Sequence, residues 1–512
     1  MTERPTDRRL LLPLVFIAGM VSLGVEFGAS RLLAPFFGTS LYVWGLLIGL
    51  ILLYLSAGYV IGGRIADRFP KSEVLYQLTA VAALWIGLIP LAAQPILALS
   101  QRGFATVSAG LVLGTLIAVV GLFAVPVTLL GCVSPYAIRL LVTDVGSSGR
   151  TAGALYALST AGSILGTFVP VFWFIPSYGT RLTFIGFSLV LLAISVAGLW
   201  PRRRIFAVLG VLVVVGWIAL PATIKPPAVG RLLFEKESAY HYIQVVQDGS
   251  RTELILNEGQ AIHSIYDSEK LTTGGPWDYF LVASAFQPAL PAEKPPTDVA
   301  IIGLAGGTAA RQYTNAYGSG VSITGVEIDP EVLSAGYRYF HLGDAHAKAV
   351  VQDGRYWLAT DPGRYDVVIM DAYRQPYIPF HLTTREFFQL AHDHLRPDGV
   401  AVVNAGRTAT DYRLVEAVAS TMSAVFPSVY LVDVPAFTNT LVFGSMKPIT
   451  VADIQHNLGL PTEPLVRQVA DSTQVEGKLR VSPYHSQVFT DELAPVERLI
   501  DQIILGYVSN GG

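Results

Sequence analysis

The pattern of apolar and polar positions divides the chain into two parts. Over the first 220 or so residues, long apolar runs alternate with short polar or Pro/Gly-rich stretches. A helix needs about 20 mostly apolar residues to cross the hydrocarbon core of a bilayer. We therefore expect a multi-pass α-helical membrane domain over residues 1–221. It would hold seven or eight spans, with candidates at 10–36, 42–63, 73–93, 104–130, 151–175, 180–200 and 204–221.

The second part has the shorter periods of a domain that folds in water. A linker is expected at 222–232, and alternating strands after it predict a small N-terminal β subdomain with a gate segment at 233–296. Between 297 and 445, buried strands alternate with helical stretches, which is typical of an α/β Rossmann-like domain with a parallel sheet. Residues 446–512 are expected to form a C-terminal helical appendage.

Composition and charge support this division and exclude some functions. Apolar residues make up 52% of the chain and charged residues 14%. Residues 1–229 hold 15 basic and 6 acidic side chains, whereas 230–512 hold 20 and 32. No basic stripe is available to neutralise phosphates, so we expect no nucleic-acid partner. The single cysteine, Cys132, excludes internal disulfides and multi-cysteine metal sites, and the histidines lack metal-ligand spacing, so no metal is expected.

Three stretches of the membrane part invite an interpretation. Glu26 lies inside the first span with Arg31 close by, which is either a functional site or a structural pair. Residues 62–68 resemble the loop signature of major-facilitator transporters. Small residues at close spacing over 153–166 predict tight packing of helix backbones.

Acidic and glycine residues follow successive strands of the predicted sheet. The buried strand 299–303 runs into a glycine-rich turn, and Glu327 ends the next strand. That separation, about 20 residues, suits a carboxylate that binds ribose hydroxyls. Asp353 and Asp371 follow two further strands. Because ligands of open α/β sheets bind beyond the carboxyl ends of the strands, the arrangement predicts a nucleoside site of the S-adenosylmethionine type.

Taken together, the motifs at 303–308, 326–330, 352–354 and 371–373 resemble the polyamine aminopropyltransferases, or spermidine synthases. The resemblance is strongest to their membrane-fused bacterial branch and covers about 235–445, with further matches at 31–35 and 62–68. It implies a transferase of polyamine biosynthesis that uses decarboxylated S-adenosylmethionine or S-adenosylmethionine as cosubstrate and a small-molecule amine as acceptor. It also implies a homodimer.

The resemblance implies roles for particular residues. Asp371 matches the catalytic aspartate that helps to deprotonate the attacking amine, with Tyr373 beside it. Glu327 would bind the ribose and Asp353 the adenine amino group. The full nucleoside-binding set is Gly303, Gly306, Gly307, Glu327, Asp353, Pro379 and His263, the last of these if one residue is inserted in the alignment. The substrate-binding set is His241, Trp277, Asp278 and Arg374.

Two departures leave other functions open. The family's glycine loop carries an aspartate where this chain has Gly306, and its catalytic loop carries a second aspartate where this chain has Arg374. Both changes remove negative charge from places where cations bind, and an arginine suits a carboxylate better. One alternative is an S-adenosylmethionine-dependent methyl- or aminocarboxypropyltransferase acting on a membrane-embedded acceptor. Another is a polyamine transporter or sensor with a non-catalytic nucleoside-binding domain.

The orientation in the membrane follows from the basic clusters and the chemistry together. With seven spans, the positive-inside rule places the basic loops in the cytoplasm and the C-terminal domain outside. A nucleoside cosubstrate is expected in the cytoplasm, so we place the catalytic domain there and expect an extra span in 104–142 or a re-entrant segment. The expected location is the cell (inner) membrane, with the lipid bilayer as a partner.

Overall fold

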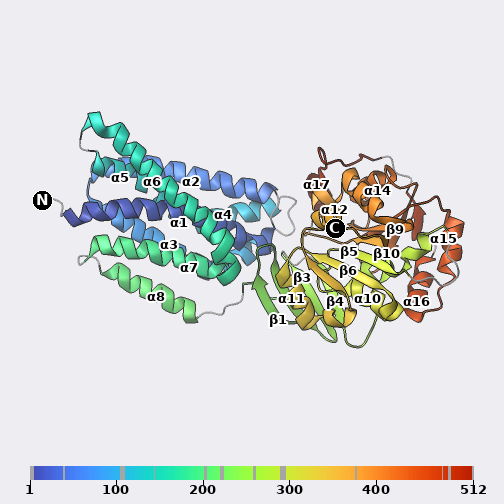
Figure 1. The fold of residues 1–512 in the computed structure, drawn as a ribbon. Coiled ribbons are helices and arrows are strands. Elements are labelled where there is room, and N and C mark those ends of the chain that lie inside the picture. Colours follow the sequence, from blue (N-terminus) through green and yellow to red (C-terminus); the bar gives the residue numbers. More distant parts are fainter. Residues whose placement is uncertain are drawn as a thin grey trace. The chain divides into compact units, whose positions relative to one another are not determined.

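The computed structural model forms two compact units. One comprises Met1–Pro226 with Lys236–Tyr242, and the other Pro227–Glu235 with Ile243–Gly512. The structure describes residues 5–38, 41–103, 110–142, 144–200, 204–219, 224–257, 261–288, 296–374, 377–475, 477–482 and 486–509. Figure 1 gives the element labels.

The first unit is helical. Its elements are α1 (Pro5–Phe37), α2 (Leu41–Arg68), α3 (Ser72–Gly103), α4 (Gly110–Gly131), α5 (Val133–Leu141), α6 (Ser148–Val169), α7 (Ile175–Leu199) and α8 (Ile205–Ala219). Among the described residues, five stretches are long and apolar enough to cross a membrane. Ser148–Leu199 counts as one stretch of 52 residues because a π-helical turn at Pro170–Phe174 joins α6 to α7. The backbone leaves the helical conformation at Gly179, which lies between the predicted spans 151–175 and 180–200. The apolar helix α8 is not counted among the five because it has only 15 residues.

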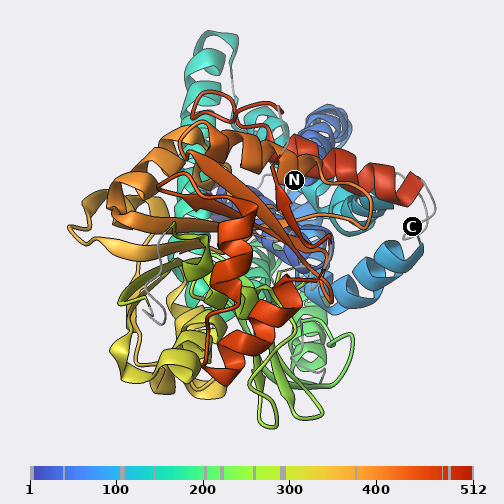
Figure 2. The same ribbon diagram turned by 90° about the vertical axis from the view of Figure 1, so that its right-hand side faces the viewer.

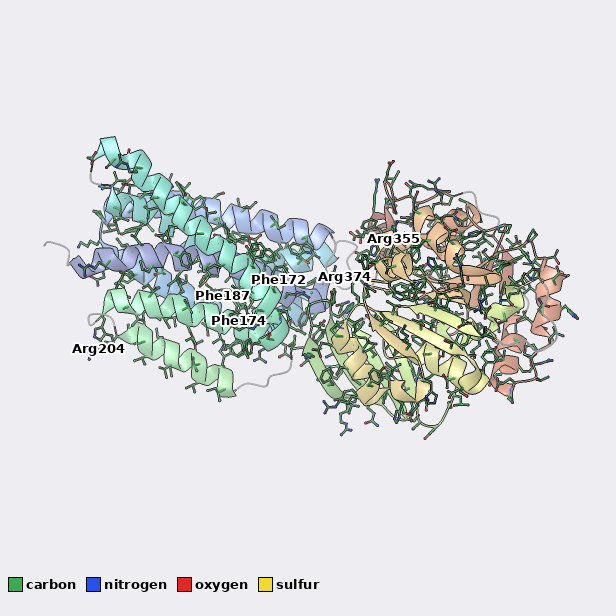
Figure 3. The ribbon with its side chains drawn as sticks, viewed as in Figure 1. Phe172, Phe174, Phe187, Arg204, Arg355 and Arg374 are labelled. Carbon is green, nitrogen blue, oxygen red and sulfur yellow. The ribbon has the colours of Figure 1, made fainter. Side chains whose placement is uncertain are left out.

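Close backbone approach between α1 and α6 confirms the predicted tight packing of the small residues. A β-carbon added to Gly162 would lie 2.0 Å from the carbonyl oxygen of Phe16, and one added to Gly166 would lie 2.0 Å from that of Met20. Any larger residue at these positions would force the two helices apart. Phe187 of α7 (Figure 3) fills the space beside Gly24 of α1 in the same way.

A short segment outside the helices belongs to the helical unit. Within Lys236–Tyr242, the buried carboxylate of Glu237 accepts hydrogen bonds from the backbone N–H of Thr180 (2.6 Å) and from its hydroxyl (2.7 Å). Thr180 follows Gly179, where α7 is kinked with φ 80°. The kink leaves backbone N–H groups without helical acceptors, and the carboxylate satisfies one of them.

A small antiparallel sheet opens the second part of the chain. Its four strands pair in the order β1-β2-β3-β4, and they are β1 (Arg231–Glu237), β2 (Tyr242–Asp248), β3 (Arg251–Leu256) and β4 (Ile262–Asp267). Alternate apolar residues of β2 and β3 pack against α11 (Pro330–Tyr339), burying Ile243, Val245, Leu254, Leu256, Val332, Ala335 and Phe340 together.

The larger sheet has eight strands in the order β12-β10-β11-β9-β8-β5-β6-β7. They are β5 (Asp298–Ile302), β6 (Ser322–Glu327), β7 (Lys348–Val351), β8 (Tyr365–Met370), β9 (Leu395–Gly406), β10 (Ser428–Val434), β11 (Asn439–Ser445) and β12 (Leu479–Val481). Strands β5 to β9 pair in parallel, and β11 is antiparallel to both β9 and β10. The order of the parallel strands reverses between β5 and β8, which is where ligands of open α/β sheets bind. The predicted Rossmann-like α/β fold is confirmed.

Helices cover both faces of this sheet (Figures 1 and 2). Val299 and Ile301 of β5 face one apolar core, and Ala300 and Ile302 face the other, as expected for a strand buried on both sides. The helices are α9 (Pro276–Tyr279), α10 (Thr308–Tyr317), α11, α12 (Gly354–Thr360), α13 (Arg385–His394), α14 (Arg413–Ser423), α15 (Val451–Leu458), α16 (Pro464–Thr473) and α17 (Val496–Ser509). The segment 446–512 holds three of them, but it also adds β12 to the sheet edge and so is not wholly helical.

Candidate active site

The parallel strands bring the predicted glycine and acidic residues to one edge of the sheet. Ile302 of β5 lies in register with Val326 of β6 and with Met370 of β8. The residues that follow these strands are therefore neighbours, although they are far apart in the sequence. Gly303 and Asp371 in particular come from adjacent strands at the point where the strand order reverses.

Gly303 is required by the contact between the two strand ends. Its φ is 89°, and an added β-carbon would lie 2.5 Å from the carbonyl oxygen of Asp371. Gly307 also has a left-handed φ of 90°, and Leu342 occupies the space where its β-carbon would stand. Both glycines thus serve to keep the loop between β5 and α10 close to its neighbours.

Gly306 packs against a serine rather than opening into space. Its backbone N–H donates to the hydroxyl of Ser264 (2.8 Å), and a β-carbon on Gly306 would lie 2.9 Å from that of Ser264. An aspartate at position 306 would have to displace Ser264, which is itself buried. The contact with β4 therefore favours a residue without a side chain at position 306.

Glu327 and Asp353 follow β6 and β7. The buried carboxylate of Glu327 accepts from the backbone N–H groups of Ala305 (3.0 Å) and Asp329 (3.1 Å), so it faces the glycine loop. Asp353 caps α12 by accepting from the N–H of Tyr356, and its other oxygen lies 3.2 Å from Nε2 of His381.

Asp371 is placed to act as a base near neutral pH. Burial raises the pKa of its carboxyl to about 7, against the opposing effects of the Asn404 amide, which donates to it (2.8 Å), and of the Trp277 side chain. Asn404 is held in turn by the amide of Asn439 (2.9 Å), and its carbonyl oxygen accepts from the hydroxyl of Tyr373 (2.9 Å). The catalytic candidates Asp371 and Tyr373 thus share one hydrogen-bonded network.

Residues 287–452 match the family model described as the spermine/spermidine synthase domain. This part of the chain therefore resembles the spermine/spermidine synthase family. A probable polyamine aminopropyl transferase of Bifidobacterium longum is 33% identical over 294 residues, which are 53% of this chain and 64% of that relative. Polyamine aminopropyltransferase 2 of Pseudomonas aeruginosa is 30% identical over 224 residues, covering 42% of this chain and 61% of the relative.

The chain thus spans less than two thirds of the length of these curated relatives. Among solved structures, a probable spermidine synthase from Corynebacterium glutamicum has a TM-score of 0.38 at 20% sequence identity. That alignment covers 51% of this chain and 98% of the other.

Asp278 lies just before the matched part of the spermidine synthase domain, where it has a visible structural role. Its buried carboxylate accepts from the backbone N–H and the hydroxyl of Thr273, from the N–H of Gly274 and from the amide of Gln312 (2.5 Å). Burial raises the pKa of Asp278, and these donors oppose the rise. The carboxylate of Asp278 thus binds the loop residues Thr273 and Gly274. Trp277, its neighbour, instead lowers the pKa of Asp371.

The other predicted residues lie at separate places in the chain. His263 is half-buried in β4, next to Ser264, and Pro379 immediately precedes a turn at Phe380–Leu382. Arg374 is exposed after β8 (Figure 3). His241 is buried in the segment that belongs to the helical unit, so it is not among the residues that the sheet brings together.

Three residues of the site escaped the sequence analysis. Asn404 donates to Asp371, and Asn439 donates to Asn404, but neither asparagine stands in a motif. His381 gave no signal beyond being one of several histidines without metal spacing. Only their positions could have indicated Asn404 and His381. His381 lies in the loop between β8 and α13, which begins with Asp371, and Asn404 lies on β9, the next strand along the chain.

Proposed function

We propose that this protein is a membrane-anchored aminopropyltransferase. It moves an aminopropyl group from decarboxylated S-adenosylmethionine to an amine such as putrescine and releases methylthioadenosine. The observation that carries the proposal is Asp371, a carboxyl with a pKa of about 7 at the strand-order reversal of a spermidine synthase domain. A general base works best when its pKa lies near the working pH.

The transfer is a displacement at the carbon next to a sulfonium. The amine nitrogen forms a bond to that carbon, the carbon–sulfur bond breaks, and its electron pair leaves on sulfur to give a neutral thioether. The proton that the amine loses passes to Asp371, either before or after the carbon–nitrogen bond has formed. Since the sulfonium is already an activated leaving group, the protein mainly positions the reactants and accepts this proton.

The remaining strand ends suit the nucleoside. Glu327 would exchange backbone donors for ribose hydroxyls, and Asp353 would accept from the adenine amino group, with Pro379 against the base. Gly303, Gly306 and Gly307 let the cosubstrate approach the backbone at the start of α10. We assign His263 to the nucleoside, and Trp277 and Arg374 to the acceptor. His241 stays a predicted acceptor-binding residue, whereas the carboxylate of Asp278 is bound by the protein's own loop.

The helical unit supports an integral membrane location. Its five long apolar stretches would cross the lipid bilayer, and the catalytic unit would face the cytoplasm, where its nucleoside cosubstrate is expected. Membrane extraction of the expressed protein tests this: we expect release by detergent but not by high salt or carbonate. Release by salt alone would contradict the proposal.

Product analysis by mass spectrometry tests the reaction. The purified protein is incubated with decarboxylated S-adenosylmethionine and putrescine, and we expect methylthioadenosine and spermidine in equal amounts. The protein is also incubated with each reactant alone. Consumption of the nucleoside without an aminopropylated amine would refute aminopropyl transfer.

An alternative is favoured by Gly306 and Arg374. Ser264 fills the space beside Gly306, and Arg374 adds positive charge near the acceptor side, so both changes suit a cosubstrate with a carboxylate. S-adenosylmethionine would then donate a methyl or aminocarboxypropyl group to a membrane-embedded acceptor. Calorimetric titration with both nucleosides separates the two: tenfold tighter binding of the carboxylated form would favour the alternative.

Replacing Trp277 with phenylalanine should move the pH dependence of the reaction. The indole N–H stabilises the charged form of Asp371, so its loss should raise the pKa of that carboxyl above about 7. A base with a higher pKa becomes active only at higher pH, and the acid limb of kcat/KM should shift to the alkaline side. Trp200, an exposed tryptophan of the helical unit, serves as the control when changed to phenylalanine. An unshifted limb would show that the indole does not act on Asp371.

A further inference from the structure

The loop after β8 carries most of the acceptor side of the proposed site, and the end of the chain holds it. Asp371, Tyr373 and Arg374 lie at its start, and it ends at Thr384, the residue before α13. The C-terminal segment 489–501 contacts the described part of this loop at two separate places. From the sequence, that segment showed no usable motif.

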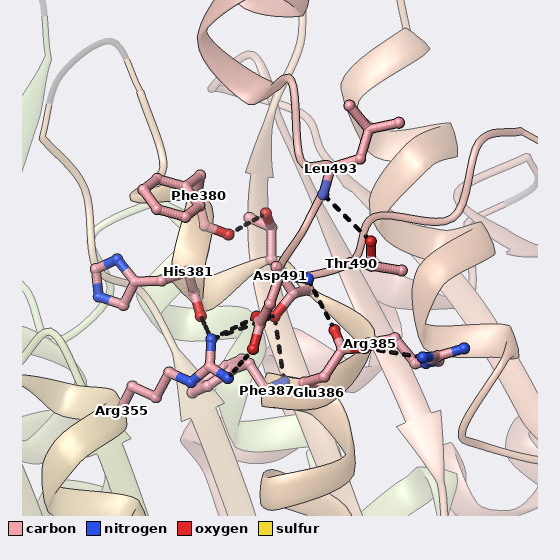
Figure 4. A network of polar contacts seen from close by, with 11 residues as sticks. Arg355, Phe380, His381, Arg385, Glu386, Phe387, Thr490, Asp491 and Leu493 are labelled. Atoms are coloured by element: carbon pink, nitrogen blue, oxygen red, sulfur yellow. Dashed lines mark hydrogen bonds and ion pairs between the residues drawn. The ribbon is translucent and has the colours of Figure 1, made fainter.

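The first contact lies on the nucleoside side (Figure 4). The guanidinium of Arg355 binds both oxygens of Asp491 (2.7 and 2.6 Å) and also donates to the carbonyl oxygen of His381 (3.0 Å). The hydroxyl of Thr384 donates to Asp491 as well (2.7 Å). Since His381 lies 3.2 Å from Asp353, this bidentate pair fixes a neighbour of the proposed adenine-binding carboxylate.

The second contact lies on the acceptor side. The hydroxyl of Tyr377 donates to the buried carboxylate of Asp501 in α17 (2.6 Å). Tyr377 and Arg374 exchange two backbone hydrogen bonds (2.8 and 3.0 Å), which close a tight turn. The position of Arg374 is therefore tied to α17 through Tyr377. A hydrogen bond between two buried groups is costly to break, because water cannot easily reach the group that remains.

The same helix brings negative charge toward Arg374. Glu497 precedes Asp501 by one helical turn and is half-buried. Burial and the carboxylate of Asp501 raise the pKa of Glu497, and the cation of Arg374 lowers it, so the three groups lie within electrostatic range. Glu497 thus lies one helical turn from the carboxylate that binds Tyr377. The backbone of Tyr377 is in turn bonded to that of Arg374, which stands where the family has its second aspartate.

We propose that the segment 489–501 is a working part of the transfer site. Asp491 and Asp501 are positioning residues that hold the catalytic loop from its two ends, and Glu497 offsets the charge of Arg374 so that a cationic acceptor can bind. The inference rests on the proposed function and deepens it. It predicts that some substitutions in this short segment weaken binding of the nucleoside, whereas others weaken binding of the acceptor.

Two variants test the positioning. Tyr377→Phe should raise KM for putrescine and lower kcat, together by about tenfold in kcat/KM, and leave the Kd for methylthioadenosine within twofold. Asp491→Asn should weaken methylthioadenosine binding by about tenfold through Arg355 and His381. Asp501→Asn keeps an acceptor for Tyr377 and should remain close to wild type, whereas Asp501→Leu should match Tyr377→Phe. Thermal unfolding checks that all variants fold.

The charge effect is tested by a double-mutant cycle. Glu497→Gln should raise KM for putrescine, because it exposes the charge of Arg374. Arg374→Gln alone should change KM little, because Glu497 already offsets that charge, whereas adding Arg374→Gln to Glu497→Gln should bring KM back to near wild type. Glu492→Gln is the matched control, because it removes an exposed carboxylate of the same segment. Equal effects of Glu492→Gln and Glu497→Gln, or purely additive effects in the cycle, would overturn the charge assignment.

Failure of the proposed function can be told apart from failure of the positioning role. A wild-type protein that forms no spermidine would refute aminopropyl transfer, but methylthioadenosine binding would still report on the nucleoside end of the loop. Unchanged binding in Asp491→Asn, in a protein that binds the nucleoside, would refute the positioning role whatever the reaction is.

Discussion

Replacing Asp371 with asparagine is expected to lower kcat by about 10²–10⁴-fold, the usual contribution of a general base. Asparagine keeps the shape of the side chain and can still accept from Asn404, but it cannot take the proton from the amine. Spermidine formation measured by mass spectrometry gives the rate. In the wild type, kcat/KM should rise with pH up to about 7, the pKa of Asp371, and this limb should vanish in the residual activity of the variant.

The same substitution should change stability in a direction that activity alone does not reveal. Because the folded-state pKa of Asp371 is raised to about 7, the folded protein binds this proton more tightly than the unfolded chain does. Stability is therefore lost as pH rises from about 4, the unfolded value, to about 7. Asparagine does not ionise, so the variant does not lose this stability. The Tm of the variant minus that of wild type should therefore increase across this window and keep its higher value above it. A constant Tm difference at all pH values would contradict the burial of Asp371.

Replacing Gly303 with alanine is expected to destabilise the catalytic unit and disrupt the site together. The backbone at this position has a left-handed φ of 89°, which costs a non-glycine residue about 1–2 kcal/mol. The added β-carbon would also meet the carbonyl of Asp371 at 2.5 Å, so β5 and the catalytic loop must separate. We expect the melting transition of the catalytic unit to fall by several degrees and transfer activity to be lost.

Gly318→Ala separates the two causes. Gly318 also has a positive φ, 64°, but nothing lies within 4 Å of its added β-carbon. It should therefore show the backbone cost alone, with activity retained. If Gly303→Ala were no worse than Gly318→Ala in both stability and activity, the close contact with Asp371 would not matter.

The strand framework could be predicted because its signal is local. Buried strands such as 299–303 are continuous apolar runs, and Glu327 and Asp371 stand directly after them. In a parallel sheet, position after a strand is sufficient to place a residue at the binding edge. The same reasoning could not assign Asp278, whose donors come from a loop and from Gln312, 34 positions away.

Long-range pairings account for most of what the sequence did not reveal. The contacts of Tyr377 with Asp501 and of Arg355 with Asp491 join residues 124 and 136 positions apart. Neither pair has a spacing that a motif could record. The number of apolar stretches differed for another reason: the predicted spans 151–175 and 180–200 form one stretch, because the helix continues through a π-helical turn at Pro170–Phe174 and is only kinked at Gly179.

The carboxylate of Glu237 bears on how such a two-part chain can be inherited. A fragment that begins at residue 227 would keep Glu237 and lose both donors of Thr180. A fragment that begins after Tyr242 would avoid this but would sacrifice strand β1. A single cut in the gene therefore costs either this pair of hydrogen bonds or a strand of the small sheet. A descendant that shed its helices at residue 227 would lose less, because water replaces the donors of an exposed carboxylate.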